Sequence, residues 1–359
     1  MNFPIIFILM YLSVLPNFLA AAFHLMNGVH YSFTTNFSFP KVTAKSDSYY
    51  DYDIISDRIL DQIHLENLKE TVYDLSSFHI RHTESENIDY VASWLTEKLQ
   101  NICGRDVYIH NFTHTPKGEE DNDAVDSQQN QFREKMPTYH LKNIVCEKPG
   151  LTNNTIIISA HYDSRMEDIK NSTARAPGAD DNASGVSALL EVARILSNVS
   201  LNNSIIFVVF PGEEQDKWGS TQYADYIDKA DVDLDLLINL DMVGFSPKET
   251  NDDFLIEYDN GNVVQDNDKY SRAVASFIKS IAGKYTNLNA TLGVLGNADY
   301  LPFEALGYTV IGLHNDGVTK NPNHHTMNDT PDLLDYGYLT SVTRLTLATI
   351  LGLDNLLDK

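Results

Sequence analysis

The chain has 359 residues, with 26 lysines and arginines against 50 aspartates and glutamates, which gives a formal net charge of −24 at pH 7. A surface this acidic repels phosphate backbones, so we expect no nucleic-acid partner. Hydrophobic residues make up 43% of the chain, as in a globular protein with a substantial core, and the two cysteines form no Cys-x-x-Cys pair, which excludes cysteine-based zinc and redox motifs.

The first residues of the chain resemble a secretory signal peptide. An uncharged, mostly apolar run extends from Phe3 to Leu15, and small alanines follow at positions 20–22, an order typical of a signal and its cleavage site. The alternative is an uncleaved membrane anchor, but the apolar run is short for a full span. We therefore expect residues 1–22 to be a signal peptide, residues 23–53 to be an N-terminal arm or short propeptide, and the mature protein to be secreted, extracellular and not stably inserted in a membrane.

Two further features of the sequence suit an oxidising, extracellular compartment. The density of Asn-x-Ser/Thr triplets predicts a glycoprotein. These triplets begin at Asn36, Asn111, Asn153, Asn171, Asn182, Asn198, Asn202, Asn289 and Asn328. In such a compartment Cys103 and Cys146 could form one disulfide, and the alternative is two separate buried thiols.

The first part of the domain is expected to contain two helical segments and a hairpin. Helical patterning extends from Ile54 to about Leu75, and the spacing of apolar residues predicts a helix over Asn87–Leu99. The alternation in Asp106–Phe112 is typical of a strand, and Tyr139–Cys146 is expected to return beside it. The acidic, polar segment His114–Met136 between them indicates a loop.

Strands and helices alternate in the rest of the chain. The predicted strands are Thr155–Ala160, Ser204–Phe210, Leu236–Leu240 and Thr309–Leu313, and the predicted helices are Ser184–Ser197, Trp218–Lys229, Lys269–Ala282 and Tyr338–Leu357. Strands that are apolar throughout and alternate with helices indicate a largely parallel sheet that is covered on both faces. We predict a single α/β domain over residues 54–359, a three-layer α/β/α sandwich with a mixed, mostly parallel central sheet and an antiparallel hairpin at its start.

Five polar clusters each follow a predicted strand or a strand-linked loop. They are His161-Tyr162-Asp163-Ser164, Asp180-Asp181-Asn182, Glu213-Glu214, Asp241 and His325. Ligands of open α/β sheets bind beyond the carboxyl ends of the strands, so we expect these clusters to converge on one crevice. Imidazoles and carboxylates without thiolates suit Zn²⁺ or another divalent first-row ion.

On these residues the chain resembles metallopeptidase family 28, and in particular its secreted, dinuclear zinc aminopeptidases of the leucyl aminopeptidase type. The resemblance covers about Ile54 to Lys359. Its motifs are Ser159–Ser164, Pro177–Gly185, Gly212–Glu214, Asn239–Met242 and His325–Thr330, in the family's order. The resemblance implies a zinc-peptidase-like fold in which residues 54–359 are the catalytic domain.

The resemblance also implies a set of metal ligands. It implies that His161 binds one of two Zn²⁺ ions, that His325 binds the other, and that Asp181 bridges them. Glu214 joins one of these sites and Asp241 joins the other. Three carboxylates and a bridging hydroxide would offset the two cations, so such a cluster can lie in a cleft.

Other residues are expected to act beside the metals. By resemblance Glu213 is the general base, which takes the proton of the shared water and delivers it to the leaving amine. Because a metal-bound histidine usually donates its second N–H to a carboxylate or carbonyl, Asp163 is expected to orient His161, and Asp329 to do the same near His325.

The substrate-lining residues are expected to be His324, Asp299, Tyr300 and Phe303. Some family members have a tyrosine before the final histidine as an oxyanion donor, and here that position is His324, so either His324 or Tyr300 is expected to donate. The segment containing Asp299 and Tyr300 resembles the family's substrate side. The alternative is an N-capped helix with Phe303 in the core.

The expected function is therefore that of a secreted metallo-aminopeptidase, which removes N-terminal residues from peptides with a free N-terminus through a water activated by two zinc ions. One alternative is a carboxypeptidase or glutaminyl-cyclase-like relative on the same fold. Carboxypeptidase relatives usually have extra domains and basic residues for the substrate carboxylate, neither of which the sequence shows clearly, and a cyclase is expected to use one metal. The other alternative is a non-catalytic binding ectodomain, but such proteins lose ligands or the base.

Overall fold

The computed structural model describes residues 57–116, 137–246, 252–315 and 321–356. The predicted signal peptide (1–22), the arm (23–53) and most of the predicted loop 114–136 lie outside the described residues. None of the helices in these four ranges combines the length and the apolar character that crossing a membrane requires.

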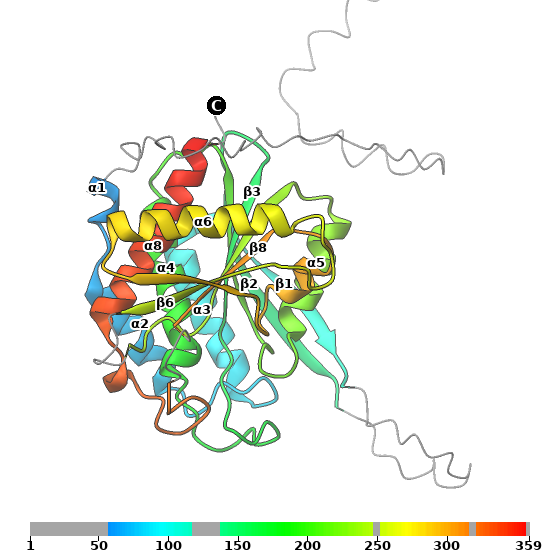
Figure 1. The fold of residues 1–359 in the computed structure, drawn as a ribbon. Helices are drawn as coiled ribbons and strands as arrows, with labels where there is room; N and C mark the ends of the chain where they lie inside the picture. The colour runs from blue at the N-terminus through cyan, green and yellow to red at the C-terminus, as the bar shows by residue number, and fades with distance from the viewer. Residues whose placement is uncertain (1–56, 117–136, 247–251, 316–320, 357–359) are drawn as a thin grey trace, which may run out of the picture. The chain divides into compact units, whose positions relative to one another are not determined.

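A mixed, eight-stranded sheet forms the centre of the domain (Figure 1). Its strands lie in the order β1-β2-β4-β3-β5-β8-β6-β7. The inner strands β3, β4, β5 and β8 run parallel to one another, whereas β2 is antiparallel to β4 and β6 is antiparallel to β8. The bounds are β1 Val107–His114, β2 Tyr139–Lys148, β3 Thr155–His161, β4 Ser204–Phe210, β5 Leu234–Leu240, β6 Asp253–Tyr258, β7 Asn289–Val294 and β8 Val310–His314.

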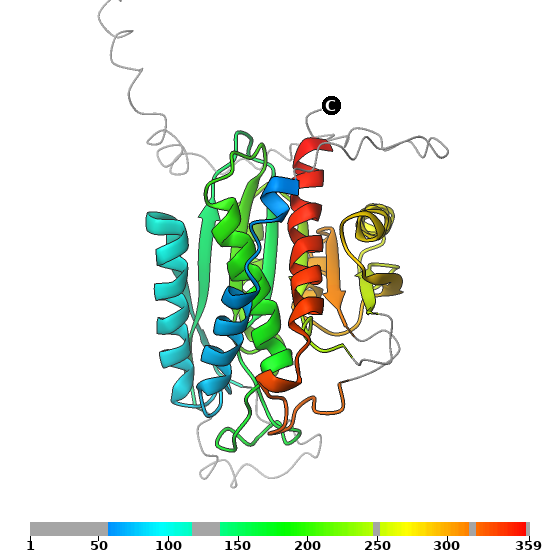
Figure 2. The same ribbon diagram turned by 90° about the vertical axis from the view of Figure 1, so that its left-hand side faces the viewer.

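Helices cover both faces of this sheet. The helices on one face are α2 (Leu65–Ser77), α3 (Asn87–Cys103), α4 (Gly185–Leu196), α6 (Asp268–Tyr285) and α8 (Tyr336–Leu356). Figure 2 looks onto this face and shows α2, α3, α4 and α8 side by side in front of the strands. The opposite face is packed by α5 (Trp218–Lys229) and the short α7 (Leu301–Glu304).

Strand β4 shows why the inner strands are apolar throughout. Its odd-numbered residues from Ile205 to Val209 pack in the core on the α4 side, and its even-numbered residues from Ile206 to Phe210 pack in the core on the α5 side. A strand that is buried on both faces leaves no position for a polar side chain until it ends. The predicted three-layer α/β/α fold with a mixed, mostly parallel sheet and an initial hairpin is thus confirmed.

The structure differs from the sequence prediction in a few elements. The helical segment predicted from Ile54 is interrupted, because α1 (Asp57–Leu60) ends before α2 begins. The prediction missed β6 and β7 altogether. β7 is an edge strand with three exposed positions and a glycine, so its sequence lacks the apolar run that marks the inner strands.

The two cysteines form a disulfide. Cys103 ends α3 and Cys146 lies in β2, with their Cα atoms 6.2 Å apart. Of the two alternatives for these cysteines, the structure therefore has the bridge, which ties a covering helix to the sheet.

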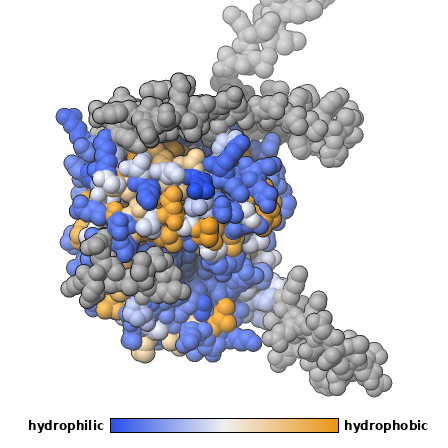
Figure 3. Space-filling view, viewed as in Figure 1, coloured by the Kyte–Doolittle hydropathy of each residue, from blue (hydrophilic) through white to orange (hydrophobic). Residues whose placement is uncertain are grey.

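Figure 3 shows that hydrophilic residues predominate on the visible face of the molecule and that hydrophobic residues occur there in scattered groups, in keeping with the high net charge.

Candidate metal centre

The chemistry-bearing side chains lie where three neighbouring parallel strands end. His161 is the last residue of β3, Glu213 and Glu214 follow β4, and Asp241 follows β5. Because β3 lies between β4 and β5 and all three run in the same direction, their carboxyl ends meet at one edge of the sheet. The turn after β4 favours glycine: Gly212 has φ of 78°, and a Cβ there would lie 3.0 Å from the Cβ of Trp218.

Asp181 lies in a tight turn that leads into α4. This turn is the segment Ala179–Ser184, in which Asp181 and Asn182 have non-helical backbone angles, and the peptide bond after Asp181 is cis. The following side chain, Asn182, is fully buried and fixes the turn to β5, because its amide donates to the Leu240 carbonyl at 2.8 Å and its Oδ1 accepts the N–H of Met242 at 3.2 Å. The turn thereby holds Asp181 over the strand ends.

One oxygen of Asp181 faces the histidine at the end of β3. His161 Nε2 lies 3.1 Å from Asp181 Oδ1 and 3.4 Å from Asp241 Oδ1. Burial alone would lower the pKa of His161, but Asp241, Asp163 and Asp181 together hold it well above its usual value. These three residues, His161, Asp181 and Asp241, form one group whose ligand atoms all lie within 4.8 Å of one another.

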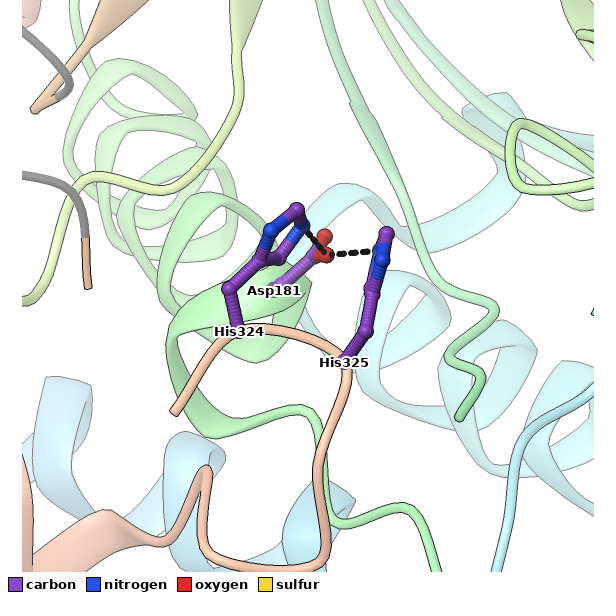
Figure 4. Close-up of side chains that lie close together, drawn as sticks. All are labelled: Asp181, His324 and His325. Carbon is purple, nitrogen blue, oxygen red and sulfur yellow. Dashed lines mark ion pairs between the residues drawn. The ribbon is translucent and has the colours of Figure 1, made fainter. Parts of the chain in front are cut away.

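The other oxygen of Asp181 faces two consecutive histidines in the loop after β8. Figure 4 shows both imidazoles turned toward the carboxylate, with His324 Nε2 at 2.9 Å and His325 Nε2 at 3.0 Å from Asp181 Oδ2. The three residues form a second group with ligand atoms within 4.8 Å. The carboxylate of Asp181 thus lies between nitrogens from two sides of the crevice, as a bridging ligand would.

Glu214 lies beside the second group without completing it. Its Oε2 is 3.1 Å from His325 Nε2, but it is 2.6 Å from Nε of Arg165, whose guanidinium therefore competes for this carboxylate. The prediction assigned Glu214 to one of the two metal sets without saying which. In the compact group around His325 the third residue is His324, which was predicted to line the substrate.

The donor atoms fit a divalent metal. They are carboxylate oxygens and imidazole nitrogens, the set that zinc accepts in proteins. Glu214 Oε1 is buried and has no hydrogen-bond partner in the described part of the chain, and His325 Nε2 lies beside the carboxylates of Asp181 and Glu214. Burial alone would raise the pKa of Asp181, but His161, His324 and His325 hold it well below its usual value, so this buried position suits a negative charge beside cations.

Asp163 links the two halves of the site. Its Oδ1 lies 3.4 Å from His161 Nδ1, beside the histidine that it was predicted to orient. The same carboxylate accepts the backbone N–H groups of Glu213 at 3.3 Å and Glu214 at 3.2 Å. Asp163 therefore couples the position of His161 to that of the two glutamates.

Asp329 does not lie against His325 as the sequence suggested. Its carboxylate accepts the backbone N–H of Asp180 at 3.1 Å and that of Asp181 at 3.1 Å. The chain turns after His325 toward the Asp180–Asp181 turn, and Asp329 is buried there. Asp329 therefore holds the backbone at Asp180 and Asp181 in place and does not serve to orient a histidine.

A cavity of about 440 Å³ opens over these side chains. The residues that line it are Arg165, Ile169, Asp181, Glu213, Glu214, Asp216, Lys217, Asp241, Met242, Asn297, His314, His324 and His325. Four of them, Asp216, Lys217, Met242 and His325, have positive φ although none is a glycine. Such unfavourable backbone conformations persist mainly at functional sites.

Glu213 faces this cavity from the turn after β4. Burial raises the pKa of its carboxyl well above the usual value. His161 opposes this rise, and the negative charges of Asp299, Glu214 and Asp241 add to it. A carboxylate that prefers to hold a proton, placed beside the metal group, has the properties of a general base.

Three predicted substrate-lining residues do not line the cavity. Asp299 and Phe303 are fully buried, and Tyr300 is 1% exposed. Phe303 packs against Phe210 in the core, and the Tyr300 hydroxyl donates to Glu257 at 2.9 Å. Tyr300 and Phe303 belong to the hydrophobic cluster on the α5 side of the sheet. Asn297, just before them, reaches the cavity instead, so only His324 among the four predicted residues lines it.

The sequence prediction missed a fully buried arginine below the site. Arg81 donates from Nε to the Tyr162 carbonyl at 2.8 Å and from Nη2 to the Gly178 carbonyl at 2.8 Å, and Nη1 donates to the carbonyls of Leu75 and Pro177. It thus joins the segment after His161 to the turn that presents Asp181. Its position in the sequence, between apolar helices, gave no signal for this role. Arg165 and Lys217 were likewise missed.

Comparisons with known proteins agree with this arrangement. The sequence profile described as Peptidase family M28 matches residues 143–350, more than half of the chain. A "Probable zinc metalloprotease" of Pyrenophora tritici-repentis is 29% identical over 343 residues, which cover 83% of this chain and 76% of that protein. "Leucine aminopeptidase 1" of Coccidioides posadasii is 27% identical over 306 residues, which cover 81% of this chain and 71% of that protein.

Solved structures share the fold. The Legionella pneumophila LapA aminopeptidase superposes with a TM-score of 0.67 at 19% identity and covers 88% of this chain and 78% of its own. A Bacteroides thetaiotaomicron glutaminyl cyclase bound to N-acetylhistamine superposes with a TM-score of 0.63 at 20% identity and covers 80% of this chain and 98% of its own. One fold thus holds two reactions, and only the residues of the site can distinguish them.

Proposed function

Because the chain belongs to peptidase family M28, we propose that it is a zinc-dependent aminopeptidase, which hydrolyses the N-terminal residue from peptides with a free N-terminus. The observation that supports this most directly is the position of Asp181, whose two oxygens face histidines on opposite sides of the crevice. The similarity to a leucine aminopeptidase agrees with it.

We propose that the chain holds two zinc ions. His161, Asp181 and Asp241 would hold one ion, and Asp181, Glu214 and His325 the other, with Asp181 shared. When bound, the ions would supply Lewis acidity, which polarises the scissile carbonyl and makes a water more acidic. His324 lies as close to Asp181 as His325 does, so it is a further nitrogen donor on the second side or an N–H donor to the substrate oxyanion.

The protein's own residues would move the proton. Glu213 would accept the proton of the attacking water and return it to the leaving amine. Asp163 would keep Glu213 in reach by holding its backbone N–H, and would orient His161 from the same carboxylate. Glu213 and Asp241, which both face the cavity, would attract the positively charged N-terminus of the substrate.

We also propose that the protein is secreted, with residues 1–22 removed as a signal peptide. The disulfide between Cys103 and Cys146 supports this proposal, because disulfides form and persist in oxidising compartments. Mass spectrometry of protein purified from the medium of a eukaryotic host should find a mature N-terminus near residue 23. A chain that is retained in cells with residues 1–22 intact would contradict secretion.

Activity assays test the proposed reaction. The purified chain should hydrolyse aminoacyl-p-nitroanilides and free-amine peptides but not the same peptides with an acetylated N-terminus. Cleavage of N-blocked peptides from the carboxyl end would favour the carboxypeptidase alternative, and cyclisation of N-terminal glutamine without hydrolysis would favour the cyclase. Inactivity of zinc-loaded protein on all three would favour the non-catalytic alternative.

The Glu213→Gln variant tests the assignment of the base. We expect it to bind as much zinc as the wild type, because Glu213 is not among the proposed ligands, and to lose about 10²–10⁴-fold in kcat because no carboxylate accepts the proton. Metal analysis and steady-state kinetics measure the two quantities. Turnover within tenfold of the wild type would remove Glu213 from this role.

A further inference from the structure

A lysine is fixed in the wall of the cavity at the start of α5. Lys217 follows the Glu213–Glu214 turn, and its side chain is only 12% exposed although it lines the cavity. Its Nζ donates to Oδ1 of Asn297 at 2.9 Å and to Oδ1 of Asp216 at 3.0 Å. Asn297 lies on the opposite loop, after β7, and lines the cavity as well. The ammonium group is therefore held at a defined place in the wall of the cavity that Glu213 also lines.

The backbone takes an unfavourable path to place this lysine. Asp216 has φ of 79° and Lys217 has φ of 59°, the left-handed region that side chains with a Cβ seldom adopt. Two such residues in succession persist only where the surroundings require them, and here both line the cavity. A surface lysine without a role would not need this conformation.

The ammonium group retains binding capacity. A lysine has three N–H donors, and in the described part of the chain two of them have acceptors, Asp216 and Asn297. Asp216 is 90% exposed, so solvent screens its charge and weakens its attraction for the ammonium group of Lys217. The third N–H is available to a molecule in the cavity.

A second cation faces the same cavity. Arg165 donates from Nε to Glu214 and from Nη1 to the carbonyls of Met166 and Glu167, so within the described residues the N–H groups of its Nη2 remain for a ligand. Five carboxylates line the same cavity, three of which are proposed metal ligands, so Lys217 and Arg165 are the two basic side chains that an anionic group of a substrate would meet there. Of the two, Lys217 is the more informative, because it contacts no proposed metal ligand.

We propose that Lys217 determines substrate specificity by binding a carboxylate of the peptide, so that the enzyme prefers short or acidic peptides. This inference rests on the proposed function and names its substrate class. The carboxylate has two sources: the free C-terminus of a dipeptide, or the side chain of an acidic residue. Either would receive a charge-assisted hydrogen bond from Nζ, which an amide of the same shape cannot match.

Measuring how peptides bind to an inactive variant tests the role of Lys217 separately from turnover. In the zinc-loaded Glu213→Gln protein, isothermal titration calorimetry would compare Leu-Gly with Leu-Gly-amide for the terminal source, and Leu-Glu-amide with Leu-Gln-amide for the side-chain source. We expect the acid of one pair to bind about tenfold more tightly than its amide. The advantage should fall to within twofold when Lys217→Met is added, and should remain with Lys217→Arg, which keeps the charge.

Lys229→Met in the same background is the matched control, because Lys229 lies on the exposed side of α5 with 78% of its side chain exposed. It should leave the acid preference unchanged. Absence of binding, absence of any preference, or a preference that survives Lys217→Met would overturn the role of Lys217. Wild-type turnover of the same peptides is measured in parallel. Acid-selective binding without hydrolysis would reject the peptidase function and leave the assignment of Lys217 intact.

Discussion

At the scale of single residues, the two oxygens of Asp181 organise the candidate centre. One faces His161 and the other faces His324 and His325, although these residues lie far apart in the sequence. Residue type and position after a strand were enough to predict that five polar clusters would converge here, whereas the individual ligand roles were predicted from the family resemblance. The sequence predicted that His324 faces the site, but it could not reveal that Arg165 competes for Glu214 or that His324 lies beside Asp181, because both depend on side-chain directions within loops.

Arg81 provides a residue-scale test of how the loops of the site are held. We expect Arg81→Met to lower the free energy of unfolding by about 3–5 kcal/mol, because four buried carbonyls lose their donor and the nearby carboxylates lose a buried positive charge. Urea unfolding followed by circular dichroism measures the loss, and Arg81→Lys should recover part of it. Arg272→Met, on the exposed side of α6, is the control. A loss below 1 kcal/mol for Arg81→Met would show that these contacts contribute little.

Replacement of Asp235 by asparagine is expected to stabilise the protein in a pH-dependent way. Its Oδ2 is buried in β5 without a hydrogen-bond partner in the described chain, and burial, with the charge of Asp233, raises its pKa to about 6. The folded protein thus binds this proton more tightly than the unfolded chain, so ionised Asp235 destabilises the fold above pH 6. We expect Asp235→Asn to stabilise the protein by about 1 kcal/mol at pH 8, a value reduced for partial exposure, and by little below pH 4. Thermal unfolding at both pH values measures this, with exposed Asp266→Asn as control. An equal effect at both pH values would exclude the titration of Asp235 as its cause.

At the scale of elements, the inner strands were predictable and the outer ones were not. The predicted bounds of β4 and α5 equal the observed ones, because burial on both faces makes β4 apolar throughout and a regular apolar face marks α5. β6 and β7 lie at the far edge of the sheet, where partly exposed positions weaken the pattern. The position of Phe303 could not be predicted either. Asn297 reaches the cavity, but Phe303 lies in the short helix α7 and points into the core.

The disulfide between α3 and β2 gives a prediction at this scale. It closes a segment with a sequence separation of 43, and the entropy that this removes from the unfolded chain corresponds to about 4 kcal/mol. The Cys103→Ser/Cys146→Ser double variant should therefore unfold at a markedly lower urea concentration and keep its kinetic constants, because the bridge is remote from the cavity-lining residues. The wild type with dithiothreitol should approach the variant. Equal midpoints in all three samples would mean that the bridge adds no stability.

At the scale of the whole molecule, the proposed activity depends on loops that the sheet brings to one edge. The order of motifs along the chain and the rule that ligands bind beyond the carboxyl ends of parallel strands were enough to predict this convergence. The cationic wall formed by Arg165 and Lys217 could not be predicted, because neither residue stands in a motif and the chain is strongly acidic overall. In the proposal for Lys217, it is the feature that would determine which peptides bind.

Anomalous X-ray scattering at the zinc absorption edge, from crystals grown with zinc, is the most direct test of the two-ion centre. We predict two peaks on either side of Asp181, one within bonding distance of His161 and Asp241 and the other within bonding distance of His325 and Glu214. A single peak, or two peaks of which neither touches Asp181, would contradict the shared-carboxylate centre from which the proposed hydrolysis follows.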